Sequence, residues 1–147
     1  MLFSFGREHR RERQRGHAVV EVACLSPWIF MLFAGTFDMG MYGYALISTE
    51  NAARAAAVYT SASTSTAGDN AKACQYALAE MSSVPNLRGI STCSAYPLKV
   101  TAESKAGIDG ATASEVTVTY QTPQLIPIPG LMGRMIVNRK VQMRCRQ

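Results

Sequence analysis

Residues 22–37 read VACLSPWIFMLFAGTF, a run of sixteen positions without a charged side chain. The wider segment 18–47 contains only two charged residues, Glu21 and Asp38. About 20 apolar residues in a helix are enough to cross the hydrocarbon core of a bilayer, which is about 30 Å thick. This stretch therefore predicts a membrane-spanning helix, with a basic segment before it and a more polar part of the chain after it.

The net charge of +5 is concentrated at the N-terminus. Residues 1–16 hold five arginines and two glutamates, which leaves +2 for the rest of the chain. Basic residues just before an apolar run indicate the cytoplasmic side of a membrane helix. A nucleic-acid-binding protein is instead expected to spread Lys and Arg over a folded face. We therefore expect no nucleic-acid partner.

The helical pattern continues beyond the apolar run. Residues 51–59 are rich in alanine, the best helix former, so we expect one helix from about residue 18 to about residue 62. Such a helix is on the order of 65 Å long, about twice the hydrocarbon thickness. Its second half must leave the bilayer and pack on something. Arg54 is expected to be solvated or to pair with Glu50, four residues away on the same face.

The remaining residues predict a small head. A second helix is expected at about 71–83, and the pattern then changes to a period of two, which is typical of half-buried strands, in 98–103, 116–121 and 135–143. Segment 123–133 has too many prolines and glycines for a central strand. The predicted fold class is α+β, with a long N-terminal transmembrane helix packed at its C-terminal half on a short helix and a three- or four-stranded antiparallel sheet.

The four cysteines predict one disulfide. Cys24 lies in the apolar run, where cysteine behaves as a small apolar residue. Cys74, Cys93 and Cys145 lie in the part expected to be exported, where disulfides form. Cys74 with Cys93, which closes a loop of about 20 residues, is our first choice, and Cys93 with Cys145 is the second. The chain has no Cys-x-x-Cys pair, so we expect no metal site.

Residues with catalytic chemistry are sparse in this sequence. Its two histidines, His9 and His17, both precede the apolar run, which excludes a Ser-His-Asp or Cys-His arrangement in the head. The glycines are scattered singly, so no phosphate-binding loop is expected. We therefore expect neither an enzyme nor a bound cofactor.

Residues 15–27 read RGHAVVEVACLSP, in which a glycine closes a basic leader and a glutamate and a proline follow as the fifth and eleventh residues. The apolar helix then continues into an Asn-Ala-Ala-Arg-x-x-Ala segment at 51–57. This arrangement resembles the TadE-like minor pilins, or pseudopilins, of tight-adherence pilus systems, a branch of the type IV pilin superfamily. Two departures are Val22, where the family often has an aromatic residue, and His17, where small or uncharged residues are common.

The resemblance implies that a prepilin peptidase cuts between Gly16 and His17, and that Glu21 neutralises the new N-terminal amine of an adjacent subunit. The alternatives are that Gly16 is a helix-start glycine that no protease reads, and that Glu21 is a carboxylate that reaches the lipid headgroups. Asp38 is expected to find a basic group on a neighbouring chain or water at the membrane interface. Pro27 is expected to kink or loosen the helix near its start.

The expected organisation is a cytoplasmic leader at 1–16, a long helix at 17–62 that spans the inner membrane in its first half, and a periplasmic or extracellular head at 63–147. Expected partners are other pilin subunits, the prepilin peptidase, the inner-membrane pilus assembly machinery and membrane lipid. The expected role is a structural subunit, major or minor, that is assembled into, or primes, a tight-adherence pilus used in surface attachment. A rival interpretation is a single-pass membrane scaffold that binds an envelope partner and never polymerises.

Overall fold

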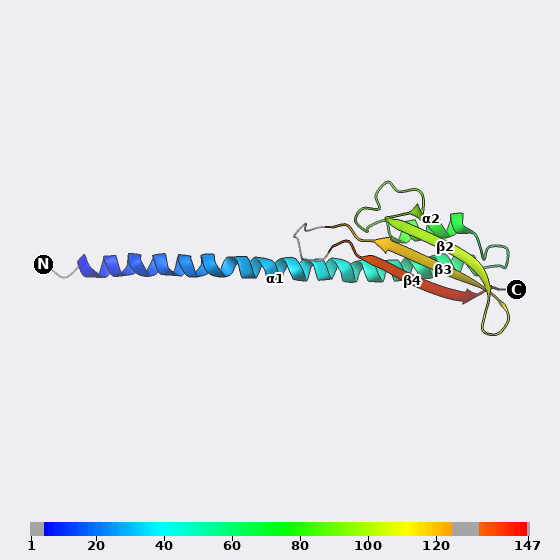
Figure 1. Ribbon diagram of the computed structural model, residues 1–147, viewed down its shortest axis with the longest axis horizontal. Coiled ribbons are helices and arrows are strands. Elements are labelled where there is room, and N and C mark those ends of the chain that lie inside the picture. The colour runs from blue at the N-terminus through cyan, green and yellow to red at the C-terminus, as the bar shows by residue number, and fades with distance from the viewer. Residues whose placement is uncertain (1–4, 125–132, 147) are drawn as a thin grey trace. The chain divides into compact units, whose positions relative to one another are not determined.

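The computed structural model describes residues 5–124 and 133–146 of the chain, with side chains from His17 onward. Its elements, in chain order, are helices α1 (Phe5–Thr60) and α2 (Asn70–Glu80) and strands β1 (Ser94–Ala95), β2 (Leu98–Ala106), β3 (Thr112–Gln121) and β4 (Ile136–Arg144) (Figure 1). The chain divides into two compact units, Met1–Phe37 and Asp38–Gln147. The predicted α+β fold class is confirmed.

Helix α1 begins at Phe5, well before the predicted start, because the arginines, glutamates and glutamine of the basic segment are themselves good helix formers. It ends at Thr60, close to the predicted end. A run of serines and threonines follows, and such side chains compete with helical hydrogen bonds by bonding to the nearby backbone. The Thr66 hydroxyl donates to the Thr60 carbonyl at 3.1 Å, so it satisfies one of the carbonyls left open at the helix end.

Helix α2 is shorter than predicted. Asp69 caps its start, where the carboxylate accepts a hydrogen bond from the backbone N–H of Lys72 at 3.0 Å. The helix ends at Glu80, and the N–H of Met81 closes the last turn on the Ala77 carbonyl at 3.0 Å. The predicted end near residue 83 was therefore too late, because the turns after Glu80 are not α-helical.

The strands form one antiparallel sheet in the order β1-β2-β3-β4. The β2·β3 and β3·β4 pairings each extend over nine residue pairs, in agreement with the period of two in the sequence. Strand β1 adds only two pairs, Ser94 with Lys99 and Ala95 with Leu98, and is too short to show an alternating pattern. The Pro- and Gly-rich segment 123–133 lies outside the described residues between 125 and 132.

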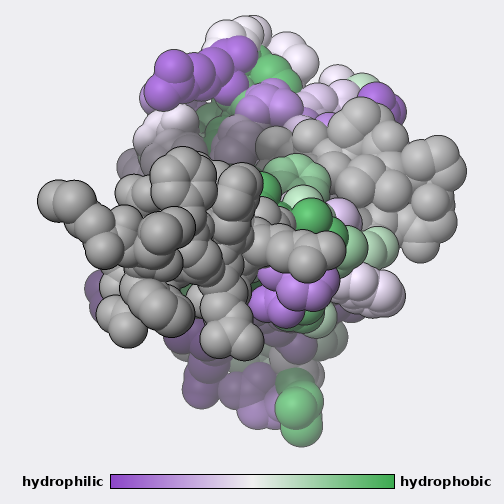
Figure 2. Space-filling view, turned by 90° about the vertical axis from the view of Figure 1, so that its left-hand side faces the viewer, coloured by the Kyte–Doolittle hydropathy of each residue, from purple (hydrophilic) through white to green (hydrophobic). Residues whose placement is uncertain are grey.

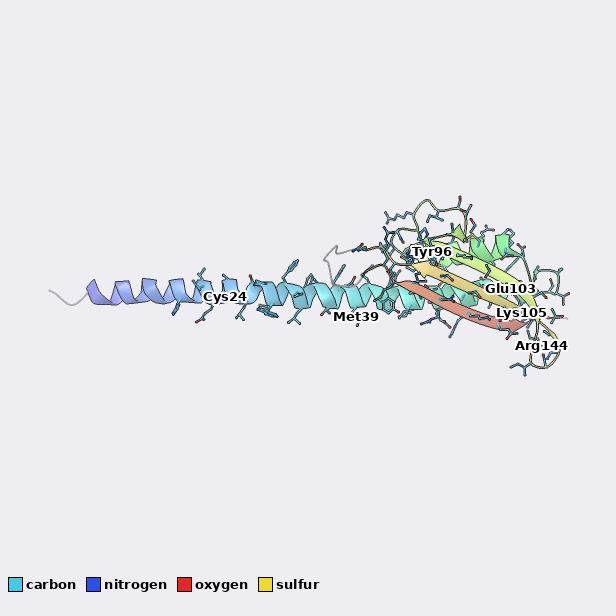
Figure 3. The ribbon with its side chains drawn as sticks, in the orientation of Figure 1. Cys24, Met39, Tyr96, Glu103, Lys105 and Arg144 are labelled. Carbon is cyan, nitrogen blue, oxygen red and sulfur yellow. A yellow bond between two sulfur atoms is a disulfide. The ribbon has the colours of Figure 1, made fainter. Side chains whose placement is uncertain are left out.

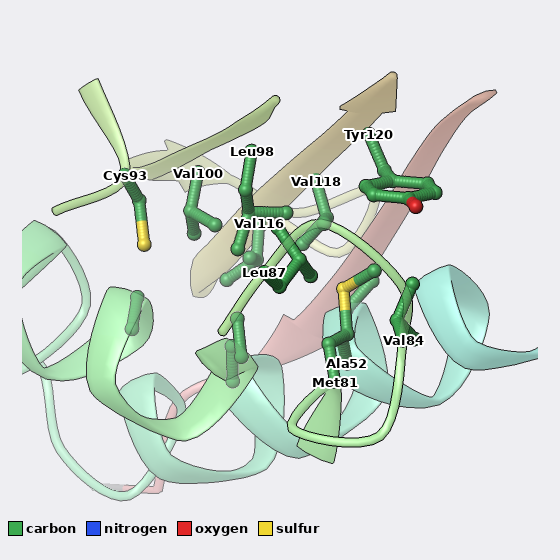
Figure 4. Packing of buried hydrophobic residues seen from close by; sticks show 14 of the residues in the cluster. Ala52, Met81, Val84, Leu87, Cys93, Leu98, Val100, Val116, Val118 and Tyr120 are labelled. Carbon is green, nitrogen blue, oxygen red and sulfur yellow. The ribbon is translucent and has the colours of Figure 1, made fainter. Parts of the chain in front are cut away.

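The core lies between one face of the sheet, α2 and the part of α1 that belongs to the second unit (Figure 4). On α1 the buried side chains are all small: Ala52, Ala53, Ala56 and Ala57 have an exposed fraction of 0%. The sheet contributes larger side chains, namely Leu98, Val100, Val116, Val118 and Tyr120. Small residues on the helix therefore meet large residues on the sheet, and α1 forms one wall of the head's core.

Candidate functional site

The first unit of the chain presents apolar side chains on every side of α1. Eleven large apolar residues there are each at least 50% exposed: Val19, Val20, Val22, Leu25, Trp28, Ile29, Phe30, Met31, Leu32, Phe33 and Phe37. Side chains project both above and below the helix near Cys24 (Figure 3). Among the described residues, one helix segment, His17–Thr60, is long and apolar enough to cross a membrane. A helix that is hydrophobic all round is typical of a membrane span, so α1 fits a single-pass membrane protein.

The proline of this segment is compensated by its neighbour. Pro27 lies inside α1 and has no N–H to donate to the Ala23 carbonyl, four residues earlier. The Ser26 hydroxyl donates to that carbonyl at 3.2 Å instead. An unsatisfied backbone group in lipid costs several kcal/mol, and serine and threonine side chains often restore the missing bond. This compensation was not predicted from the sequence, although a hydroxyl residue directly before a proline in an apolar run is its signal.

The residues of the N-terminal motif lie on one continuous stretch of α1. Gly16 and His17 fall within the helix, and Glu21 follows His17 by four residues, which places both side chains on the same helix face. Both side chains are exposed. No ion pair involves Glu21 among the side chains that the structure describes. The carboxylate is therefore presented outward from an apolar helix.

Asp38 is separated from this motif and lies with residues of the head. It is half-buried at a small cavity of about 20 Å³, room for about one water molecule. Tyr42 and Tyr44 of α1 line the same cavity, together with Tyr120 of β3. None of the described lining residues is basic. The structure therefore does not bring Glu21, Pro27 and Asp38 together as one site.

The cysteines of the head have distinct environments. Cys74 of α2 and Cys93, directly before β1, form a disulfide with a Cα–Cα distance of 5.7 Å. This pairing was the first choice predicted from the sequence. Cys145 is buried and free, so the pairing of Cys93 with Cys145 is not formed. Cys24 is free and exposed on α1.

Tyr120 fixes the segment that follows α2 to the sheet. Its hydroxyl lies 2.9 Å from the Pro85 carbonyl and 2.9 Å from Oδ1 of Asn86, and its one proton serves these two acceptors. Burial raises the pKa of Tyr120 to about 12, so the phenol stays protonated at neutral pH. Near this segment the hydroxyls of Tyr44 and Ser83 lie 2.6 Å apart, which ties α1 to the turn after α2. These hydrogen bonds are structural.

Glu50 joins α1 to the last strand of the sheet. It pairs with Arg54 at 3.0 Å, which is one of the two arrangements expected from the four-residue spacing. It also lies 3.6 Å from Arg139 of β4, a partner that the sequence did not indicate. Arg139 interrupts the apolar alternation of β4, and the contact explains why a charged residue is accommodated on the core-facing side of that strand.

A second group of charges lies on the outer face of the sheet. Glu115 of β3 forms ion pairs with Lys105 and, at 2.8 Å, with Lys140, and Lys105 also lies 3.1 Å from Glu103. The hydrogen bonds from Lys105 and Lys140 lower the pKa of Glu115, whose side chain is only 11% exposed. The hydrogen bonds to Glu115 and Glu103 raise the pKa of Lys105. Both groups therefore stay ionised at neutral pH.

The low pKa of Glu115 predicts a loss of head stability in acid. The folded-state pKa lies below the ordinary value of 4.5, so ionised Glu115 stabilises the folded state above that pH. This contribution disappears as the pH falls through the lower folded-state value. Between about pH 6 and pH 3, the urea midpoint of the wild type should therefore fall more than that of Glu115→Gln.

The variant Lys105→Met is the matched control for this titration. It removes the largest cause of the pKa shift and keeps the Glu115 carboxylate, so the acid transition should begin at a higher pH than in the wild type. The head's unfolding is followed by urea-dependent proteolysis of the full chain in micelles at each pH. Parallel pH profiles for the wild type and Glu115→Gln would contradict the prediction.

Hydrophilic residues occupy much of the periphery that is visible beside the grey atoms in Figure 2, and the apolar areas between them are small. The residues that expose large apolar side chains concentrate between 19 and 39 of α1. The candidate functional surface is therefore the N-terminal part of α1 with Glu21 at its start.

Comparison with known proteins agrees with this placement. Residues 16–58 match the model of a family described as TadE-like protein. The match begins at Gly16 and ends two residues before the end of α1, so it covers most of this helix and none of the strands. No curated protein and no solved structure matched the chain. The resemblance predicted from the sequence is therefore confirmed, and residues 16–58 of this chain form a TadE-like segment.

Proposed function

We propose that the chain is a structural, pilin-like subunit of a tight-adherence pilus, anchored in the inner membrane by α1 before it is assembled. The TadE-like family is structural and implies association with pilus components. The observation that carries the proposal is the apolar segment of α1 that follows Gly16. It has apolar side chains on all sides and carries an outward carboxylate, Glu21, near its start.

Cleavage by a prepilin peptidase between Gly16 and His17 is the first step of this proposal. It removes the basic leader and leaves the α-amine of His17 at the start of an apolar helix. An ionised carboxylate such as Glu21 is costly in lipid unless it has a partner. The amine of a neighbouring subunit provides the opposite charge, so the same pair neutralises both groups and sets the axial position of one helix relative to the next.

The proposed organisation follows from these steps. The leader at 1–16 is cytoplasmic, the helix at 17–62 is membrane-spanning in its first half, and the head at 63–147 is periplasmic and then exposed on the extracellular pilus. The partners are other pilin subunits, the prepilin peptidase, the inner-membrane assembly machinery and lipid. Pro27, compensated by Ser26, allows the helix to continue, and Asp38 is the first residue of the unit that contains the head. The pilus would serve surface attachment.

The proposal is tested with the full chain expressed beside an active or an inactivated prepilin peptidase. We expect intact mass and N-terminal sequencing to show a terminus at His17 only with the active enzyme. Glu21→Ala should be cleaved normally but recovered in sheared filaments at about one tenth of the wild-type level or less, because its partner amine loses the counter-charge.

The neighbouring substitution Val22→Ala is the matched control, because it trims an exposed side chain and keeps the charge of Glu21. It should be cleaved and incorporated like the wild type. Normal incorporation of Glu21→Ala would remove the proposed role of the carboxylate. An uncut Met1 terminus beside an active peptidase, with no protein in the filament fraction, would favour the unpolymerised membrane scaffold.

A further inference from the structure

The two edges of the sheet differ in how far their outward backbone groups are hydrogen-bonded. At the β2 edge, β1 pairs with the first two residues of the strand, and beyond β1 the N–H of Val100 donates to the Cys93 carbonyl at 3.0 Å. The next outward N–H, that of Ala102, donates to Oδ1 of Asn70 at the start of α2, at 2.7 Å. These contacts therefore close the first part of this edge, from Leu98 to Ala102, against another strand.

The hydrogen-bond register shows which backbone groups of β4 point away from the sheet. The N–H of Thr122 donates to the Met135 carbonyl, and the N–H of Cys145 donates to the Thr112 carbonyl. Because bonded residues alternate in an antiparallel pair, the odd-numbered residues of β4 face β3. The outward backbone groups are therefore those of the even-numbered residues Ile136, Asn138, Lys140, Gln142 and Arg144.

This outward row is open over most of its length. Just beyond the strand, the N–H of Arg146 donates to the Ser61 carbonyl at 3.0 Å and closes that end. Within the strand, the Asn138 carbonyl accepts one bond from its neighbour Arg139 at 3.1 Å. No other backbone group of the row has a hydrogen-bond partner in the part of the chain that the structure describes. The side chains of the row are also exposed.

The charge around this edge is of one sign. Residues 133–146 contain five basic residues and no acidic one. Lys140, Arg139 and Arg144 are each paired with an acidic residue outside β4, at 2.8, 3.6 and 3.1 Å, but their side chains remain 41–66% exposed. Arg134 and Arg146 form no ion pair with described residues. Like charges on facing strands repel, so β4 of a second copy is a poor partner for this edge.

We propose that the free edge of β4 binds an extended, acidic segment of a partner protein, which adds to the sheet as a further antiparallel strand. Backbone hydrogen bonds provide affinity in this mode of recognition, and side-chain complementarity provides specificity. The basic side chains select glutamate or aspartate in the incoming strand and disfavour a copy of β4. The surface belongs to the head, so the inference does not depend on cleavage at Gly16 or on assembly through α1.

The test uses the full chain in nonionic detergent micelles and two synthetic nine-residue peptides. The acidic probe is Glu-Val-Thr-Val-Glu-Val-Thr-Val-Glu with blocked termini, and the control peptide replaces each Glu by Lys. We expect the acidic peptide to bind at least about tenfold more tightly than the control at low salt. Equal binding of the two peptides would overturn the inference.

Amide hydrogen exchange, resolved by residue, separates strand addition from loose ionic contact. In the free protein the amides of Lys140 and Gln142 should exchange fast, whereas those of Val141 and Met143 should be protected by β3. The acidic peptide should slow the exchange of the outward amides at least about tenfold and leave the inward amides unchanged. Peptide binding without this alternating protection would overturn the inference. Protection of the outward amides without peptide, increasing with protein concentration, would also overturn it, because the edge would then pair with a second copy of the chain.

The variant Gln142→Pro removes one outward N–H without removing a bond to β3, a position where an edge strand accommodates proline. Gln142→Ala is its control, because it removes the side chain and keeps the N–H. Peptide affinity should fall about tenfold or more in Gln142→Pro and stay near the wild-type value in Gln142→Ala. Equal affinity of the two variants, both shown by proteolysis to be folded, would contradict strand addition.

Discussion

Loss of the Cys74–Cys93 disulfide should lower the free energy of unfolding of the head by about 3 kcal/mol, by the chain-entropy estimate for a loop of this length. The two residues are 19 positions apart, and the bond ties α2 to the segment that leads into β1. Without it, the unfolded chain gains the freedom of that loop. The double variant Cys74→Ala/Cys93→Ala should therefore unfold at a lower urea concentration than the wild type.

The measurement must report the unfolding of the head. The chain's one tryptophan, Trp28, lies in the apolar part of α1, so its fluorescence does not report on the sheet. Urea-dependent proteolysis of the full chain in micelles is suitable, because cleavage follows the population of opened head. A reductant should lower the urea midpoint of the wild type to that of the double variant, and it should leave the midpoint of the double variant unchanged. A double variant as stable as the oxidised wild type would contradict the prediction.

Leu98→Ala should destabilise the head by about 2–5 kcal/mol, the range for truncating a buried leucine. Leu98 has an exposed fraction of 0%, pairs with Tyr120 across the sheet and packs in the core shown in Figure 4. Its truncation removes apolar contacts and leaves a cavity that the surrounding strands cannot fully close. The same proteolysis measurement gives the change in unfolding free energy.

Ile136→Ala is the control for this truncation. Ile136 begins β4 as Leu98 begins β2, but its exposed fraction is 55%. Its loss should change the unfolding free energy by no more than about 0.5–1 kcal/mol. Similar losses for the two variants would show that strand propensity, and not burial, determines the effect at these positions.

Patterns that repeat along the chain were sufficient to predict most of the fold. The apolar run at 22–37 and the alanines at 51–59 predicted one long helix, and alternation in β2, β3 and β4 predicted the sheet. Strand β1 was not predicted, because a two-residue strand has no period and is formed only by its partner β2. Element ends were less accurate. Helix α1 begins at Phe5 because its basic segment is also rich in helix formers, and the end of α2 depends on the local hydrogen bond of Met81.

Contacts between distant parts of the chain were harder to anticipate. To predict the pairing of Arg139 with Glu50, one must know how β4 lies against α1. To predict that Asp38 and Tyr120 line one cavity, one must know how β3 lies against α1. The motif around Gly16 and Glu21 was recognisable because its information is local, and the family match covers the same helix. The open edge of β4 had no sequence signal beyond its basic composition.

The alanine wall of α1 also decides how this head tolerates change. Ala52, Ala53, Ala56 and Ala57 have almost no side-chain atoms to lose, so each substitution other than glycine adds volume to a closed interface. An alanine scan, the usual way to find important positions, would not detect this interface, because its residues are already alanine. Nearly every substitution at these four positions therefore introduces a larger side chain, which would push the helix away from the sheet. Homologues that keep the same helix–sheet distance should therefore keep small residues at these positions.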